Sequence, residues 1–120
     1  MRPAFRAGEY VFVDATDLPP DVQVEATVRE AEGPSAVIAR RDADALGLRY
    51  DFVGAWITLT VRSSLESIGL TAAVSSELAK LGIGCNVIAG LHHDHLLVSA
   101  GRADDALTAL RRLSGRPSPR

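Results

Sequence analysis

The sequence has little cysteine and few aromatic residues. Its 120 residues include a single cysteine, Cys85, and Phe, Trp and Tyr together make up 5%. One cysteine cannot form an internal disulfide, and the chain does not open with the pattern of a secretory signal peptide, so we expect a protein of the reducing cytoplasm. With few aromatic rings, the core must be built from Val, Leu, Ile and Ala, because hydrophobic residues still account for 47%.

A basic excess and long apolar runs are also lacking. The net charge is −2, which gives no electrostatic reason to bind nucleic acid. No apolar run approaches the roughly 20 residues that a membrane helix needs. We therefore expect neither nucleic acid nor a membrane among the partners. The paired arginines, Arg40-Arg41 and Arg111-Arg112, stand among acidic residues and are interpreted as solvated faces.

The N-terminal half shows strands separated by proline and glycine turns. Between residues 22 and 29, apolar and polar side chains alternate, which is the period of a half-buried strand. A turn at residues 32–34 leads into the next apolar stretch, so we expect a hairpin. The strands predicted here lie at residues 9–14, 22–29 and 36–39.

One short helix is expected after these strands. Asp42 is a suitable N-cap, because its carboxylate can accept a hydrogen bond from the first turn. Gly47 suits the left-handed conformation that often follows a helix. The sequence therefore predicts a short helix through residues 44–46.

The pattern becomes more regular from Trp56 onward. Strict alternation predicts a central strand, and apolar residues recur twice at helical spacing. Gly82 is expected to end the first of the two helices. The elements predicted here are a strand at 56–62, a helix at 70–81, a hairpin of strands 85–91 and 96–100, and a helix at 103–113.

This order, β-α-β-β-α, gives five of the six elements of a ferredoxin-like unit, whose sheet carries both helices on one face. We expect the N-terminal half to supply the missing edge strand or to cover the open face. The predicted fold class is α+β, ferredoxin-like, with a degenerate tandem of two such units as an alternative. The expected divisions are a β-rich half at 1–54, a ferredoxin-like domain at 55–113 and a disordered tail at 114–120.

The stretch from Trp56 to Val74 resembles the first strand, ligand loop and first helix of ACT domains, whose loop typically ends in glycine and an apolar residue. Here those are Gly69 and Leu70. Residues 81–90, Leu-Gly-Ile-Gly-Cys-Asn-Val-Ile-Ala-Gly, followed by His-Leu-Leu-Val-Ser from His95, resemble later strands of the ACT domains that regulate aspartate kinases. As a whole, the chain is similar to a small family of stand-alone bacterial ACT proteins of uncharacterised function.

The resemblance implies a ligand site at an interface between ACT units, formed by the first loop of one unit and the second strand of another. The implied positions are Ser63, Ser64, Glu66, Gly69, Leu70, Asn86, Val87 and Ile88. A helix N-terminus can bind the carboxylate of an amino acid, with Gly69 allowing close approach. Glu66 or Asn86 could accept hydrogen bonds from the ammonium group. Alternatively, Ser63 and Glu66 simply form a capping box. Residues 66–69 also depart from the common Asp-Arg-Pro-Gly loop, so the ligand's identity is not carried over.

Three histidines and an aspartate form the tip of the predicted hairpin, at residues 92–95. Imidazole and carboxylate groups are all ligands for divalent metals. In a strand, however, only His93 and His95 share a face, so at most these two and a further group would meet one ion. The alternative is a polar hairpin tip without a metal.

Two further residues are interpreted as structural. Cys85 lies among apolar residues and is expected to be a small buried side chain rather than a reactive thiol. Trp56 is expected in the core or at a subunit contact.

The function predicted from these features is a non-catalytic regulatory module that binds a small metabolite, an amino acid, at an interface between ACT units. We expect it to form a homodimer. No catalytic triad or phosphate loop is present. No cofactor is expected. The alternatives are a structural dimerisation module without a small ligand, and a metal-responsive protein that uses His93 and His95.

Overall fold

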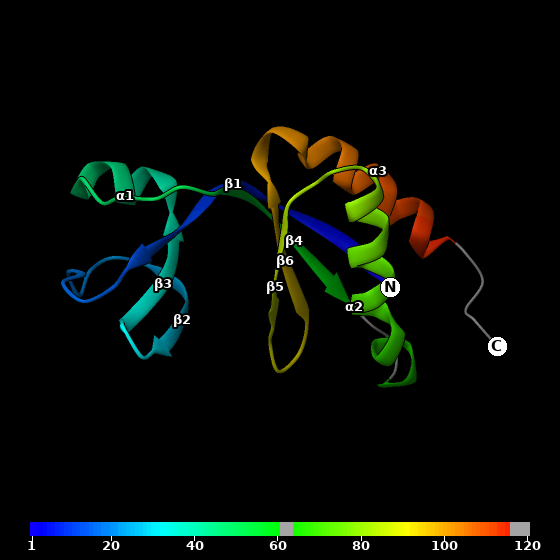
Figure 1. Ribbon diagram of the computed structural model, residues 1–120, viewed down its shortest axis with the longest axis horizontal. Coiled ribbons are helices and arrows are strands. Elements are labelled where there is room, and N and C mark those ends of the chain that lie inside the picture. Colours follow the sequence, from blue (N-terminus) through cyan, green and yellow to red (C-terminus); the bar gives the residue numbers. More distant parts are fainter. Residues whose placement is uncertain (61–63, 116–120) are drawn as a thin grey trace. The chain divides into compact units, whose positions relative to one another are not determined.

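The computed structural model describes residues 1–60 and 64–115, which form an α+β protein (Figure 1). The strands are β1 (Arg2–Asp14), β2 (Val24–Glu30), β3 (Gly33–Ala39), β4 (Val53–Thr60), β5 (Cys85–Ala89) and β6 (Asp94–Ser99). The helices are α1 (Arg40–Leu46), α2 (Ser64–Lys80), α3 (Ala103–Ser114) and a 3-10 turn at Ala100–Arg102. Among the described residues, no helix has the length and apolar character needed to cross a membrane. The expected tail falls mostly on residues 116–120, outside the described part.

The chain divides into two compact units. The larger unit consists of Met1–Ala7 and Ala55–Arg120, and the smaller unit of Gly8–Gly54. Strand β1 runs through both, its first residues in the larger unit and its remainder in the smaller.

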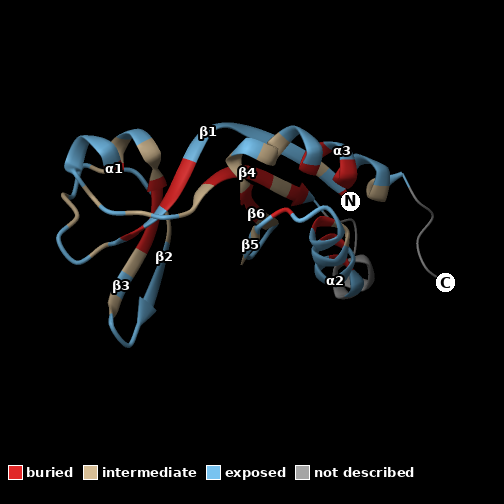
Figure 2. Cartoon of the chain, turned by 45° about the horizontal axis from the view of Figure 1, so that its top comes forward, coloured by how far each residue is buried: buried red, intermediate tan, exposed pale blue. Residues whose placement is uncertain are grey.

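The larger unit is the ferredoxin-like unit that the sequence predicts. Its strands lie in the order β1-β4-β6-β5, so the first residues of the chain supply the missing strand beside β4. The expectation of an edge strand from the N-terminal half is thus confirmed. Ile57 and Leu59 of β4 meet α2 and α3 on one face of the sheet, and parts of these three elements are coloured as buried in Figure 2. The buried members of this core are Met1, Ala55, Ile57, Leu59, Leu70, Val74, Leu78, Ile83, Leu96, Val98, Ala106, Leu107 and Leu110.

The smaller unit has a sheet in the order β2-β3-β1 with α1 on one face. Its core consists of Val11, Val13, Ala36, Ile38 and Ala43. Residues 15–23, where a complete ferredoxin-like unit has its first helix, form turns instead. The smaller unit is therefore a reduced version of the same fold, as the tandem alternative anticipates.

Strand β2 is less buried than its alternating pattern predicts. Val28 is 56% exposed, and none of the strand's seven residues is buried. The register places Ala26 opposite Val37, on the face away from Ile38 and Ala43. Helix α1 covers only the Ile38 face, and β2 stands at the end of the strand order, so its apolar side chains have little to pack against within this unit.

Several predicted helix boundaries are confirmed and two are wrong. Gly47 and Gly82 both have φ of +68° at the ends of α1 and α2, as expected for glycine C-caps. Asp42 does not cap α1: the N-cap is Ala39, which makes no side-chain cap bond, and Asp42 lies in the first turn. Helix α2 begins at Ser64, so Gly69 lies inside it rather than in a preceding turn. A glycine inside a helix costs only about 1 kcal/mol, too little to stop it.

The core of the larger unit gives a direct stability test. Leu110 on α3 is fully buried, whereas Leu91 at the hairpin tip is 93% exposed. Leu110→Ala should lower the free energy of unfolding by about 2 to 5 kcal/mol, because it removes buried methyl groups and leaves a cavity. Leu91→Ala is the control and should change it by less than about 0.5 kcal/mol. Urea unfolding followed by circular dichroism measures both, and equal effects would contradict this assignment of the core.

Candidate functional site

Three of the ligand residues that the resemblance implies lie on β5, the last strand in the order of the larger unit's sheet. Asn86 and Val87 are exposed and Ile88 is half-buried. A strand at the end of a sheet presents backbone N–H and C=O groups along its outer edge. Strand β5 can therefore offer donors and acceptors to a small ligand or to another strand.

The side chains of β5 alternate between the two faces of the sheet. Val87 is paired with Leu96, a core residue on the face covered by the helices. Ile88 is paired with His95, so Asn86 and Ile88 share the opposite face. Any ligand that contacts all three residues must therefore bind along the edge of the strand rather than on one face.

The remaining implied ligand residues lie at the start of α2. Ser63 is outside the described residues, and so are the side chains of Ser64 and Glu66, which leaves the capping-box alternative a prediction. Gly69 is exposed, and no described atom comes within 4 Å of a Cβ built on it. Leu70 is only 7% exposed and packs in the core. Gly69 thus borders open space, whereas the Leu70 side chain serves packing.

A polar cluster that the sequence analysis missed lies on the face of the larger sheet opposite its helices. The Trp56 indole N–H donates a hydrogen bond to Thr58 Oγ1 at 3.0 Å, and the same oxygen lies 3.0 Å from His95 Nδ1. The Arg6 guanidinium lies 4.3 Å from the centroid of the Trp56 ring, and the Trp56 and His95 rings are 5.3 Å apart. These four residues, from β1, β4 and β6, are called the Trp56 cluster below.

The environment of the Trp56 cluster shifts the titration of its histidine. Burial lowers the pKa of His95 below its usual value, and the positive charge of Arg6 lowers it further. Trp56 is only 3% exposed, which confirms the expected core position. Alternation along β4 puts Trp56 and Thr58 on the same face of the strand. No pattern in the sequence, however, shows that His95 of β6 lies beside them.

The hairpin tip does not gather metal ligands in the part of the chain that the structure describes. The rings of His93 and His95 are 6.3 Å apart, and no group of three or more His, Cys, Asp or Glu side chains is placed to hold an ion. His95 Nδ1 is also engaged with Thr58. Metal binding by His93 and His95 thus stays a prediction from the sequence.

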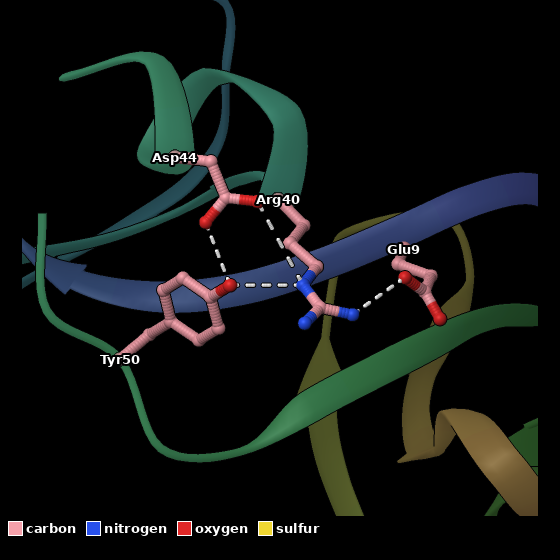
Figure 3. A network of polar contacts seen from close by, with 4 residues as sticks. All are labelled: Glu9, Arg40, Asp44 and Tyr50. Carbon is pink, nitrogen blue, oxygen red and sulfur yellow. Dashed lines mark hydrogen bonds and ion pairs between the residues drawn. The ribbon is translucent and has the colours of Figure 1, made fainter. Parts of the chain in front are cut away.

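A second polar network lies within the smaller unit and centres on Arg40 (Figure 3). The Arg40 Nε–H donates to Tyr50 Oη at 2.9 Å, and another guanidinium nitrogen pairs with Glu9 at 3.0 Å. Tyr50 in turn donates to Asp44 at 2.7 Å. The hydrogen bonds to Tyr50 and Glu9 raise the already high pKa of Arg40. The network links β1, α1 and the segment after α1, so Arg40 is a structural residue and not simply part of a solvated face.

Cys85 is half-buried rather than fully buried, and it packs against the core of the larger unit. Its thiol lies 3.7 Å from the Asn86 carbonyl oxygen, to which it can donate a weak hydrogen bond. Burial raises the pKa of the thiol. Because the thiolate is the reactive form, this environment suppresses its chemistry.

The comparisons with known families identify the fold. The ACT domain matches twice, at residues 1–55 and at residues 52–112. The chain therefore belongs to the ACT-domain family and carries two ACT units in tandem, as the resemblance in the sequence implies. In the smaller unit the turns at residues 15–23 take the place of the first ACT helix.

Solved structures agree with this assignment, whereas no curated protein matches the chain. A protein of unknown function from Vibrio cholerae, described as a possible transport protein, is 42% identical with a TM-score of 0.82, over 92% of this chain and 87% of that chain. A protein from Agrobacterium tumefaciens is 23% identical with a TM-score of 0.69, over 92% and 86%. The regulatory subunit of aspartate kinase from Thermus thermophilus is 10% identical with a TM-score of 0.65, over 93% and 97%. The last two similarities establish the fold alone.

The raised thiol pKa predicts slow alkylation of Cys85. Near about pH 8, the folded protein should react with iodoacetamide more slowly than a short cysteine peptide, because less of the thiol is ionised. Unfolding the protein in urea is the control and should bring the rate up to that of the peptide. Mass spectrometry over time measures both rates. A folded protein that reacts as fast as the peptide would show that burial does not protect Cys85.

Proposed function

We propose that the chain is a non-catalytic regulatory module that binds a small metabolite, an amino acid, at an interface between ACT units. The observation that carries this proposal is the pair of ACT matches, which follow one another from residue 1 to residue 112 and account for nearly all of the chain. The fold likeness to the regulatory subunit of an aspartate kinase supports a regulatory role.

The proposed ligand site combines the start of α2 in one unit with the β5 edge in another. Backbone N–H groups near the α2 N-terminus would bind the ligand carboxylate. Asn86 and the carbonyl groups of β5 would accept hydrogen bonds from the ammonium group. Because the two halves of the site come from different units, a homodimer is the simplest assembly that completes it. Ligand binding then shifts the equilibrium between quaternary arrangements only to the extent that the ligand binds one arrangement more tightly than the other.

Thermal unfolding of the metal-stripped protein tests this proposal against each of the twenty amino acids. A ligand that binds only the folded state adds about 2.7 kcal/mol of stability at 100 times its dissociation constant. We expect one amino acid, or a few of related chemistry, to raise the melting temperature. Stabilisation by Zn²⁺ or Ni²⁺ alone would instead support the metal-responsive alternative. No stabilisation by any amino acid would contradict the proposal.

Variants of exposed residues locate the site without disturbing the core. Gly69→Trp should abolish the stabilisation, because the indole fills the open space beside Gly69. Ser75→Trp, at another exposed position of α2, is the matched control and should retain it. Asn86→Ala should also abolish the response, with Thr108→Ala on α3 as its control. If Gly69→Trp and Asn86→Ala still respond to the amino acid, the ligand binds elsewhere.

A second candidate function is dimerisation without a small ligand, and the exposed edge of β5 is the observation that favours it. Val87, which is 39% exposed, would lie in such a contact. Val87→Lys should then raise the dimer dissociation constant at least tenfold, about 1.4 kcal/mol, because it places a charge in a desolvated interface. Light scattering over a concentration series measures this, with Thr108→Lys as the control. An unchanged dimer in Val87→Lys would exclude this edge as the interface.

A further inference from the structure

An open groove lies on the surface of the smaller unit, between α1 and the turn segment that precedes β2. Its volume is about 450 Å³. On the α1 side, Asp42, Ala45 and Leu46 stand at positions i, i+3 and i+4, so they share one face of the helix. The residues that line the groove are Pro19, Asp21, Val22, Asp42, Ala45 and Leu46. The groove therefore belongs to the smaller unit alone.

The groove borders the segment in which the smaller unit departs from a complete ferredoxin-like fold. Residues 15–23 form turns rather than a first helix, so α1 is the only helix on that face of the sheet. In the larger unit, both α2 and α3 pack on one face. The side chain of Leu46, the last residue of α1, is 41% exposed, and Val22 across the groove is half-buried. An apolar surface beside α1 is thus left without a second helix to cover it.

The groove is acidic as well as apolar. Asp21 stands on one wall and Asp42 on the other, and neither carboxylate forms an ion pair with any residue that the structure describes. Glu9 and Asp44, by contrast, pair with Arg40. Residues 8–54 contain ten acidic and four basic side chains, whereas the rest of the chain contains five acidic and nine basic ones. The charge of the smaller unit therefore attracts a positively charged partner.

The walls of the groove favour a helical partner over an extended one. They consist of a helix and a turn segment, and no residue of a strand in this unit lines them, so an added strand would find no edge to pair with. A helix instead binds a groove through apolar side chains at i, i+3, i+4 and i+7. The seven residues of α1 are about 10 Å long at 1.5 Å per residue, which about two turns of a partner helix would match.

We propose that this groove is the docking site for an amphipathic, basic helix of a partner protein. The apolar side chains of that helix cover Ala45 and Leu46, and its Lys or Arg side chains, on both flanks, pair with Asp21 and Asp42. The ligand residues proposed above lie on α2 and β5 of the larger unit, so the docking proposal does not rest on them.

A synthetic peptide of leucine and lysine tests the site on the full chain. About 18 residues are enough for a helix in water, with the leucines at i, i+3, i+4 and i+7. Fluorescence anisotropy measures its binding in about 0.1 M salt, where distant charges are screened. We expect saturable binding of one peptide per chain. A peptide of the same composition in shuffled order should bind at least tenfold more weakly, and one with glutamate in place of lysine should not bind.

Variants of exposed residues locate the peptide on the chain. Leu46→Ser and Asp21→Lys should each raise the dissociation constant at least tenfold, because they remove an apolar contact and a pairing carboxylate. Val28→Ser and Glu32→Lys make matched changes at exposed positions outside the groove and should stay within about threefold of the natural chain. Circular dichroism verifies that all four variants fold. Gly69→Trp should also bind the peptide normally, which separates this test from that of the ligand site.

Several outcomes would overturn the proposal. If the amphipathic peptide does not bind, or the shuffled one binds equally well, the groove does not recognise a helix. If Glu32→Lys weakens binding as much as Asp21→Lys, the attraction is one of net charge alone. Competition by spermidine, with no effect of Leu46→Ser, would show a site for small cations instead. A natural chain that self-associates and is dissociated by Leu46→Ser would place a second copy in the groove.

Discussion

The burial of β4 on both of its faces is the constraint on which the larger unit depends. One face carries Ile57 and Leu59 into the helix-covered core, and the other carries Trp56, which is equally buried. A buried indole leaves an N–H that must find an acceptor, because an unpaired donor costs about as much as a lost hydrogen bond. Thr58, two residues along the same face, supplies that acceptor. The Thr58 hydroxyl also lies 3.0 Å from His95 Nδ1 on the neighbouring strand, so it makes a second hydrogen bond there.

The sheet around β4 is completed by a segment far away in the sequence. The first residues of β1 lie next to β4 in the strand order, and Met1 is buried in the same core as Leu59. The larger unit is therefore assembled from two separate segments, with the whole smaller unit between them in the chain. Contacts between such distant segments form only after a long loop closes, which makes their formation slow relative to that of local structure. The hairpin β5–β6 and the helix α3, by contrast, can form locally.

The elements that the sequence predicts best are those whose pattern is set by a buried face. Helix α3 and the β5–β6 hairpin appear where periodicity places them, because the apolar stripe of α3 and alternate residues of β6, Leu96 and Val98, face one core. The first half of β1 was missed, since Arg2, Pro3 and Arg6 do not read as a strand and its pairing with β4 depends on the tertiary fold. For β2 the strand was predicted correctly but its burial was not. Its apolar residues alternate with polar ones, yet the sequence does not reveal that no element of the smaller unit covers the face on which they lie.

Sites are harder to predict than elements, because a site depends on which strands become neighbours. The Arg40 network joins Glu9, Asp44 and Tyr50 over a long stretch of sequence, and no local motif announces it. The same holds for the contact of Arg6 with Trp56. The residues implied by the ACT resemblance were found through a motif that includes Gly69. A motif gives their positions in the chain, however, and not the quaternary arrangement that would bring α2 of one unit to β5 of another.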